Sequence, residues 1–237
     1  MKPIFPILLA ALFLSACESK KDPAAAPSEA DATLIQQDTP ILPVNIGDAW
    51  IYQVHLEIPA DVTSAGASAV DTKHQRTRTY LGKVSAAQGL PETDCFEIHV
   101  PGSAKEREFV DIQEDRILMH GSLILREDTT QPMWLATPIP FIIAGAKPGT
   151  SLPEFKTTDG SLNRKTEIIA REDITVPAGT FKCIRMLTTG GDGDIELRRT
   201  IWFAPGKGII REEKTRYRHN QLIYRETHQL QELKKAP

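Results

Sequence analysis

The chain has 237 residues, a formal net charge of −3 and 41% hydrophobic residues. This mildly acidic balance argues against a nucleic-acid partner, which needs a basic surface, and against basic clusters that recognise anionic lipid headgroups. Seventeen Pro and fifteen Gly, spread along the chain, favour many short strands over a few long helices. The composition therefore predicts an all-β protein.

The chain begins with an apolar stretch that is too short to span a bilayer as a helix. Residues 4–16 carry no charge and follow Lys2. At 1.5 Å per residue they would give about 20 Å of helix, against a hydrocarbon core of about 30 Å. A positive residue followed by a short apolar stretch is typical of a signal peptide, which we predict over residues 1–16.

The apolar stretch ends in Leu14, Ser15, Ala16 and Cys17, which resemble the lipobox of bacterial lipoproteins at all four positions. The resemblance implies cleavage before Cys17 and acylation of its thiol with diacylglycerol, and it allows acylation of the new amine. Each buried CH₂ contributes about 0.8 kcal/mol, so two or three acyl chains form a durable membrane anchor. In lipoprotein sorting Asp after the cysteine favours inner-membrane retention, so Glu18 favours the outer membrane. The alternative is an ordinary secretory cleavage site with an incidental cysteine.

Residues 17–40 form a predicted flexible linker between the lipid and the folded part. They are rich in Ala, Pro and charged side chains and have almost no large apolar ones. Such a segment cannot bury enough surface to offset its ordering entropy. We therefore expect a lipid-anchored protein of the cell envelope that faces the periplasm, with one β-rich domain over residues 41–234.

The first half of this domain shows strand patterns. Apolar residues alternate from Trp50 to Ile58, which predicts a strand with one buried face. Further strand patterns cover residues 72–84, 95–100, 109–112 and 116–125. The acidic residues between them are predicted to form the solvent-facing side of a hairpin, with a glycosidase carboxylate pair as the alternative. These acidic residues are Glu106, Glu108, Asp111, Glu114 and Asp115.

Residues 133–146 are apolar but contain Pro138 and Pro140. Proline cannot donate a ladder hydrogen bond, so we predict a strand at a sheet edge or an extended crossover. The segment either fills the core of its own domain or forms an apolar surface for a ligand or partner. The candidate surface residues are Trp134, Leu135, Ile139, Phe141 and Ile142.

The last third predicts an antiparallel meander. Strand patterns cover residues 164–173, 181–188, 197–203, 209–217 and 222–230, with Gly- and Pro-containing turns at 176–179, 190–194 and 204–207. The mixed charges at 198–199 and 211–218 are predicted to pair across strands on a solvent-facing side. The final residues predict a short helix with Lys234 and Lys235 in its last turn.

Two cysteines remain beside Cys17. A Cys95–Cys183 disulfide would close a long loop and contribute about 4 kcal/mol, in a compartment that tolerates disulfides. The alternative is two unpaired thiols that behave as small hydrophobic side chains. The sequence has no CxxC, so it predicts no redox catalysis.

Three motifs resemble a family of bacterial envelope proteins, the DUF3108 and TapB-like domains of unknown function. The motifs are Pro43-x-x-x-Gly47-Asp48-x-Trp50-x-Tyr52, Val176-Pro177-Ala178-Gly179-Thr180-Phe181-x-Cys183 and Trp202-Phe203-Ala204-Pro205-Gly206-x-Gly208-Ile209. They are turn and strand residues, so the resemblance carries no catalytic residue. It implies a curved antiparallel sheet akin to the half-barrel of a lipoprotein carrier.

The sequence also contains a faint duplication. The spacing from Tyr80 to Cys95 equals that from Ile168 to Cys183, and each stretch passes through a Gly/Pro turn into a strand. This pattern predicts a pseudo-repeat of residues 43–125 and 145–230, with chance similarity between hairpins as the alternative. The expected architecture is therefore a half-barrel or two facing β-meanders.

No catalytic motif is present: the sequence has no Gly-x-Ser-x-Gly, His-Glu-x-x-His or phosphate-binding Gly-rich loop. Its six histidines show no metal-ligand spacing, and residues 190–194, which carry two carboxylates among glycines, fit a hairpin turn better than a calcium loop. We expect no cofactor, no metal and no catalytic residue. The leading hypothesis is a non-enzymatic envelope lipoprotein that binds a hydrophobic ligand, a lipidated partner or another envelope component. A structural or assembly scaffold with a filled core comes second, and an envelope hydrolase third.

Metabolic labelling tests the lipobox interpretation. Palmitate should label the protein, because Cys17 carries the acyl chains that the resemblance implies. The circular dichroism spectrum of the purified protein should report mainly strand. An unlabelled polypeptide would contradict the anchor, and a mainly helical spectrum would contradict the all-β prediction.

Overall fold

The computed structural model describes residues 40–60, 68–85, 92–126, 130–156 and 163–237. All of them belong to one compact unit, Ile35–Pro237. The predicted signal peptide, the lipobox with Cys17, and residues 17–39 of the predicted linker lie outside the described residues. Within the described ranges, no helix is long and apolar enough to cross a membrane.

The described part of the chain is built from strands and contains no α-helix, which confirms the all-β prediction. The strands are β1 (Ala49–Ile58), β2 (Val70–Ser85), β3 (Glu92–His99), β4 (Lys105–Ile112), β5 (Arg116–Leu125), β6 (Thr130–Ile143), β7 (Phe155–Lys156), β8 (Asn163–Val176), β9 (Gly179–Asp192), β10 (Ile195–Ala204), β11 (Gly208–Arg218) and β12 (Gln221–Lys234).

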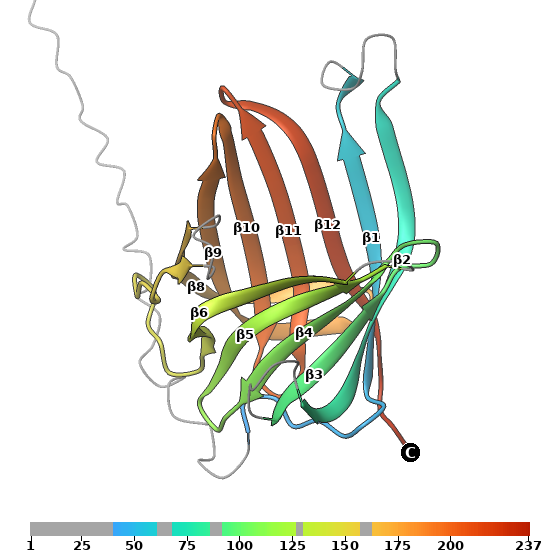
Figure 1. The fold of residues 1–237 in the computed structure, drawn as a ribbon, viewed down its shortest axis with the longest axis vertical. Coiled ribbons are helices and arrows are strands. Elements are labelled where there is room, and N and C mark those ends of the chain that lie inside the picture. The colour runs from blue at the N-terminus through green and yellow to red at the C-terminus, as the bar shows by residue number, and fades with distance from the viewer. Residues whose placement is uncertain (1–39, 61–67, 86–91, 127–129, 157–162) are drawn as a thin grey trace, which may run out of the picture. The chain divides into compact units, whose positions relative to one another are not determined.

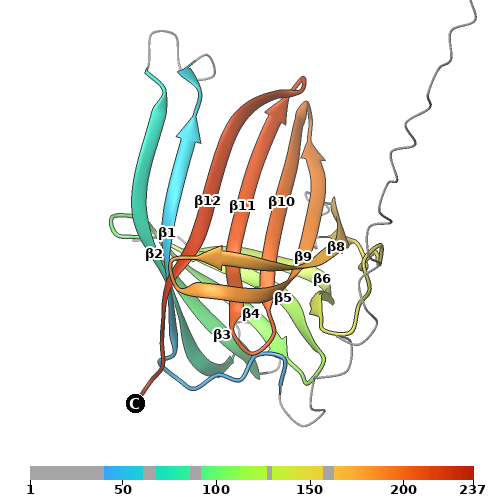
Figure 2. The same cartoon turned by 180° about the vertical axis from the view of Figure 1, so that it is seen from behind.

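All twelve strands belong to one antiparallel sheet in the order β6-β5-β4-β3-β2-β1-β12-β11-β10-β9-β8-β7. The chain runs as one meander from β1 to β6 and a second from β7 to β12, and the pairing of β1 with β12 joins the two. In Figure 1 strands β3 to β6 cross in front of β9 to β12, and in Figure 2 they cross behind them. The sheet therefore curls over itself into a nearly closed, barrel-like form, which confirms the predicted curved antiparallel sheet. The pseudo-repeat stays a prediction.

The apolar core lies inside this curled sheet, and β1 shows how the sequence builds it. Trp50, Tyr52 and Val54 alternate along the strand and are all buried. The Trp50 ring meets the Phe96 ring edge-on at 5.7 Å, and its indole N–H donates to the Lys207 carbonyl at 2.5 Å. Alternation along a strand thus places one face in the core, as the sequence predicts.

A buried carboxylate ties the segment before β1 to the end of β12. The Asp48 side chain is fully buried and accepts hydrogen bonds from the backbone N–H of Asn45 at 3.0 Å and of Ala236 at 2.9 Å. It also accepts from Lys235 Nζ at 2.8 Å. These bonds fasten the two ends of the sheet-forming chain to each other.

The predicted C-terminal helix is wrong, because residues 221–234 form β12. The strand is hydrogen-bonded on both sides, to β1 and to β11. His228 and Leu230 point inward and are buried, whereas Gln231 is exposed, so the segment alternates as a strand does. Pairing with two neighbours outweighs the helical preference of the local sequence.

The proline-containing segment forms β6, which lies at an edge of the sheet as predicted. The register against β5 changes abruptly, since Met119 is opposite Ile139 but Gly121 is opposite Trp134. The residues between Trp134 and Ile139 therefore form a bulge in the ladder. They include Pro138, which cannot donate a ladder hydrogen bond.

Of the five apolar residues proposed as a surface on β6, three are buried and two are half-buried. Leu135, Ile139 and Ile142 are buried. The Phe141 side chain packs against the main core, and the Trp134 ring lies 5.1 Å from the Phe109 ring. The role of this segment as an apolar surface for a ligand or partner stays a prediction.

The possible Cys95–Cys183 disulfide is absent from the structure. Both cysteines are free and buried, Cys183 in the main core and Cys95 in a smaller cluster with Phe109. Because the two thiols belong to different clusters, the alternative of two small hydrophobic side chains describes them.

A thiol titration distinguishes these states. Burial raises the pKa of Cys95 to about 11 and that of Cys183 to about 12, so neither forms the reactive thiolate near neutral pH. In the mature lipoprotein, whose Cys17 thiol is acylated, we expect no reaction with Ellman's reagent at pH 8 in the folded state and two reactive thiols after unfolding in urea. A disulfide would leave the unfolded protein unreactive until a reductant is added.

Candidate functional site

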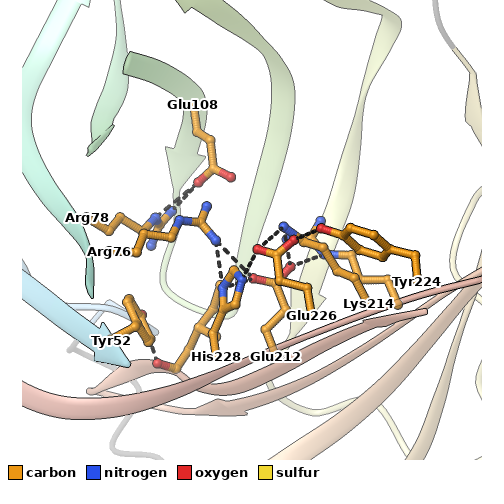
Figure 3. A network of polar contacts seen from close by, with 11 residues as sticks. Tyr52, Arg76, Arg78, Glu108, Glu212, Lys214, Tyr224, Glu226 and His228 are labelled. Atoms are coloured by element: carbon orange, nitrogen blue, oxygen red, sulfur yellow. Dashed lines mark hydrogen bonds and ion pairs between the residues drawn. The ribbon is translucent and has the colours of Figure 1, made fainter. Parts of the chain in front are cut away.

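The interior of the sheet contains a network of charged side chains beside the apolar core (Figure 3). Its members come from strands on both sides of the β1–β12 junction and point toward one another. The network residues are Arg76 and Arg78 on β2, Glu108 on β4, Arg199 on β10, Glu212 and Lys214 on β11, and Tyr224, Glu226 and His228 on β12.

Glu212 is the centre of this network. Its side chain is only 3% exposed, and it accepts a hydrogen bond from Arg199 Nε at 2.5 Å. Arg76 Nη1 lies 3.4 Å and Lys214 Nζ 3.6 Å from its carboxylate oxygens. Burial alone would raise the pKa of Glu212, but Arg199 and Lys214 hold it well below its usual range. The buried carboxylate is therefore ionised and is shared by several cations.

The His228 ring lies between two carboxylates and is 1% exposed. Its Nδ1 is 2.7 Å from Arg76 Nη1 and 3.1 Å from Glu212 Oε2. Arg76 can donate only to an unprotonated Nδ1, whereas Glu212 can accept only from a protonated one. The protonation of this one nitrogen therefore decides which of the two bonds forms.

The other ring nitrogen, Nε2, contacts Glu226, which also accepts a hydrogen bond from the Tyr224 hydroxyl. Burial would raise the pKa of Glu226, but His228 and Lys214 lower it to about 2. Glu226 is thus a half-buried carboxylate that stays ionised at neutral pH.

A further half-buried carboxylate, Glu108, pairs with Arg78. The Arg78 Nε and Nη2 atoms each lie 3.0 Å from Glu108 Oε2, and the guanidinium carbon lies 3.6 Å above the Phe96 ring. Glu106 is on the same side of β4, and burial and the neighbouring Glu108 raise its pKa. The prediction that this acidic run faces solvent is wrong for both glutamates, because the curl of the sheet turns this side of β4 inward.

Next to the network is a cavity of about 290 Å³ whose charged lining residues are mainly basic. Six of its lining residues are basic and three are acidic. The basic residues are Arg76, Arg164, Arg198, Arg199, Lys214 and Arg216, and the acidic ones are Glu106, Glu108 and Glu226. The prediction that the charges of β10 and β11 lie on a solvent-facing side is wrong for Arg199 and Lys214, which are half-buried in this wall, whereas Arg198 and Arg216 are exposed.

Two arginines of the cavity wall have no counter-ion among the described residues. No described carboxylate lies within 4.0 Å of Arg164 or Arg216, and the Nε of Arg164 is buried without a described hydrogen-bond acceptor. Burial, and then Arg199 and Arg216, lower the pKa of Arg164. The two guanidiniums contact aromatic rings instead, Arg164 at 5.7 Å from Phe155 and Arg216 at 5.0 Å from Tyr224.

A glycine makes room for the Arg164 side chain. Gly190 lies opposite Arg164 in the β8–β9 ladder, and a Cβ at Gly190 would be 2.8 Å from Arg164 Cγ.

The turn predicted over 190–194 is shorter than expected, because β9 continues to Asp192 and the chain turns at Gly193. No group of three or more His, Cys, Asp or Glu in the described ranges has the geometry to hold a metal.

Of the sequence-predicted site residues, the structure brings Ile139 and Phe141 to a second, small cavity beside the first. Trp134, Leu135 and Ile142 line neither cavity. Sequence reasoning missed the charged interior. A signal exists on β11, where Glu212, Lys214 and Arg216 continue the period-two face that begins with the buried Ile210.

No protein-family model matches the sequence, and a search of curated proteins gives no significant match. The resemblance to DUF3108 and TapB-like domains is therefore not confirmed. Two solved structures are similar. A predicted exported protein with a YmcC-like fold from Bacteroides fragilis is 13% identical, with a TM-score of 0.46 over 82% of this chain and 98% of that chain. A predicted lipoprotein from Parabacteroides distasonis is 15% identical, with a TM-score of 0.49 over 83% and 99%. Likeness at this level carries no argument about the family or activity of this chain.

Replacing Glu212 with Gln tests its role as the shared counter-ion. The change leaves Arg76, Arg199 and Lys214 without their buried partner, so we expect a loss of about 3–5 kcal/mol in the free energy of unfolding. The neighbouring Glu213→Gln is the control, because Glu213 is 29% exposed and pairs with Arg211 on the opposite face. It should cost less than about 1 kcal/mol.

The pH dependence gives a second measurement of the same residue. Because folding lowers the pKa of Glu212, its stabilising contribution is present above the unfolded value of about 4.3 and is lost as the pH falls toward the folded value. Urea unfolding of Glu212→Gln should therefore show a shallower loss of stability on acidification than the wild type. Equal stabilities of the two Gln variants at pH 7 would contradict this role.

Proposed function

We propose that this protein is a lipid-anchored component of the bacterial cell envelope that binds a small anionic ligand inside its curled sheet, without chemical turnover. The lipobox at residues 14–17 supports the anchor, and Glu18 favours the outer membrane. The three motifs that resemble DUF3108 and TapB-like envelope proteins agree with this location.

The observation that carries the binding proposal is the pair of arginines without counter-ions. Burying a cation without a partner is costly, and most charges of the interior network are paired. Arg164, whose Nε is buried, and the more exposed Arg216 line a cavity instead, without a carboxylate partner among the described residues. A bound anion would supply the missing partner, and the fixed donor fork of a guanidinium suits a carboxylate or a phosphate.

Binding is a better match to the site than hydrolysis. Hydrolysis by a carboxylate pair needs one acid with a raised pKa and a second carboxylate free to act on the substrate. Glu106 has the raised pKa, but Glu108 and Glu226 are each held in ion pairs or hydrogen bonds of the network. The scaffold alternative predicts a filled interior, whereas this interior includes a cavity near the lower end of the size range of ligand sites.

Titration calorimetry with inorganic phosphate and with acetate tests the proposal. The mature lipoprotein in a non-ionic detergent at low salt should bind one of these anions, and Arg164→Met should weaken binding at least tenfold, because a charge-assisted hydrogen bond contributes about 1.5–3 kcal/mol.

Lys165→Met is the matched control. Lys165 is the next residue of β8 and is exposed on the other side of the strand, so its loss should leave binding unchanged. No binding of either anion, or equal losses in the two variants, would contradict the proposal.

A further inference from the structure

A second cavity of about 50 Å³ adjoins the cationic one and differs from it in chemistry. The two share five lining residues, which are Met119, Phe155, Arg164, Thr188 and Arg199. Most other walls of the small cavity are apolar, and they come from β6, β9 and β10. These walls include Ile139, Pro140, Phe141, Met186 and Ile201.

Two arginines lie where the cavities meet, because Arg164 and Arg199 line both. Each guanidinium is near an aromatic ring: the Arg164 carbon is 5.7 Å from the Phe155 ring centre and the Arg199 carbon 5.8 Å from that of Phe141. An anion held at this junction would therefore have cations on one side and an apolar recess on the other.

The polar groups of the recess already satisfy each other. The hydroxyls of Thr166 and Thr188 lie 2.8 Å apart across the β8–β9 ladder. The surrounding walls are set in the core, since Met186 is 1% and Ile201 2% exposed. A group that enters the recess thus meets apolar surface and has little need of hydrogen-bonding atoms.

We propose that the ligand is an amphipathic anion, with a phosphate or carboxylate at Arg164 and Arg199 and a short alkyl group in the recess beside Phe141. This inference rests on the proposed function and specifies the ligand class of the same site. It also assigns a role to the apolar residues Ile139 and Phe141, which form the wall that the alkyl group contacts.

The test compares four probes on the mature lipoprotein: inorganic phosphate, butyl phosphate, acetate and butyrate. Each methylene transferred from water into an apolar site raises affinity about fourfold, so two buried methylenes give more than tenfold. If phosphates bind, we expect calorimetry to show butyl phosphate binding at least tenfold tighter than inorganic phosphate. If carboxylates bind, we expect butyrate to bind at least tenfold tighter than acetate. Comparison of the phosphate and carboxylate arms identifies the headgroup.

The outcomes separate this inference from the proposed function. If a bare anion and its alkyl derivative bind equally, the recess does not take an alkyl group, and the inference fails while anion binding stands. If none of the four binds, both fail. A titration into detergent alone corrects for partition of the probes into micelles.

A larger side chain in the wall of the recess tests whether the alkyl group binds there. Ile139→Phe adds bulk to the wall and should abolish the alkyl advantage while the bare anion binds as before. Ile143→Phe, on the same strand but outside both cavities, should keep the advantage. An unchanged advantage in Ile139→Phe would overturn the inference. If that variant loses its fold, the wild-type probe series alone decides.

Discussion

One buried carboxylate makes the charged interior of this protein possible. Glu212 on β11 is in contact with Arg76 from β2, Arg199 from β10 and His228 from β12. Strands β2 and β10 are separated in the sheet by β1, β12 and β11, so these contacts reach across the concave side of the curl. Each cation alone would cost several kcal/mol to bury, and sharing an ionised partner offsets that cost. The curvature and the charge network therefore depend on each other.

Along the strands, the side chains that face the interior change from apolar residues to paired charges and then to cations with no described carboxylate partner. The proposed anion site lies among these last cations. On β11 the inward face runs from the buried Ile210 through the paired Glu212 and Lys214 to the exposed Arg216. The apolar core around Trp50 and Phe96 fixes the backbone positions, and the network above it fixes the side chains. Beyond the network the wall is cationic and only partly compensated. A negatively charged ligand would thus pair with the arginines of this wall that have no carboxylate partner among the described residues.

Local patterns predicted the strands and turns well, because alternation and the placement of Pro and Gly are properties of short stretches. The Pro-Gly turn before Gly208 and the edge position of the proline-containing β6 are examples. The inward direction of Glu106 and Glu108 was not predictable in this way, since alternation defines two faces of β4 and only the curl of the whole sheet decides which one is buried. The same holds for the C-terminal strand, whose pairing with β1 involves residues far apart in the sequence. Arg164 was missed for a related reason, because its space comes from Gly190 on the next strand.

The junction between the first and last strands also bears on how the chain folds. One edge of β1 can pair with β2 once both strands have been made, but the other stays open until β12, which ends at Lys234, has been made. Contacts between such distant segments form slowly, because the intervening chain must lose much of its freedom first. Until then the two edges that will join the meanders are unprotected, and each can pair with another molecule. Shortening the chain by its final strand would make that transient, aggregation-prone species permanent.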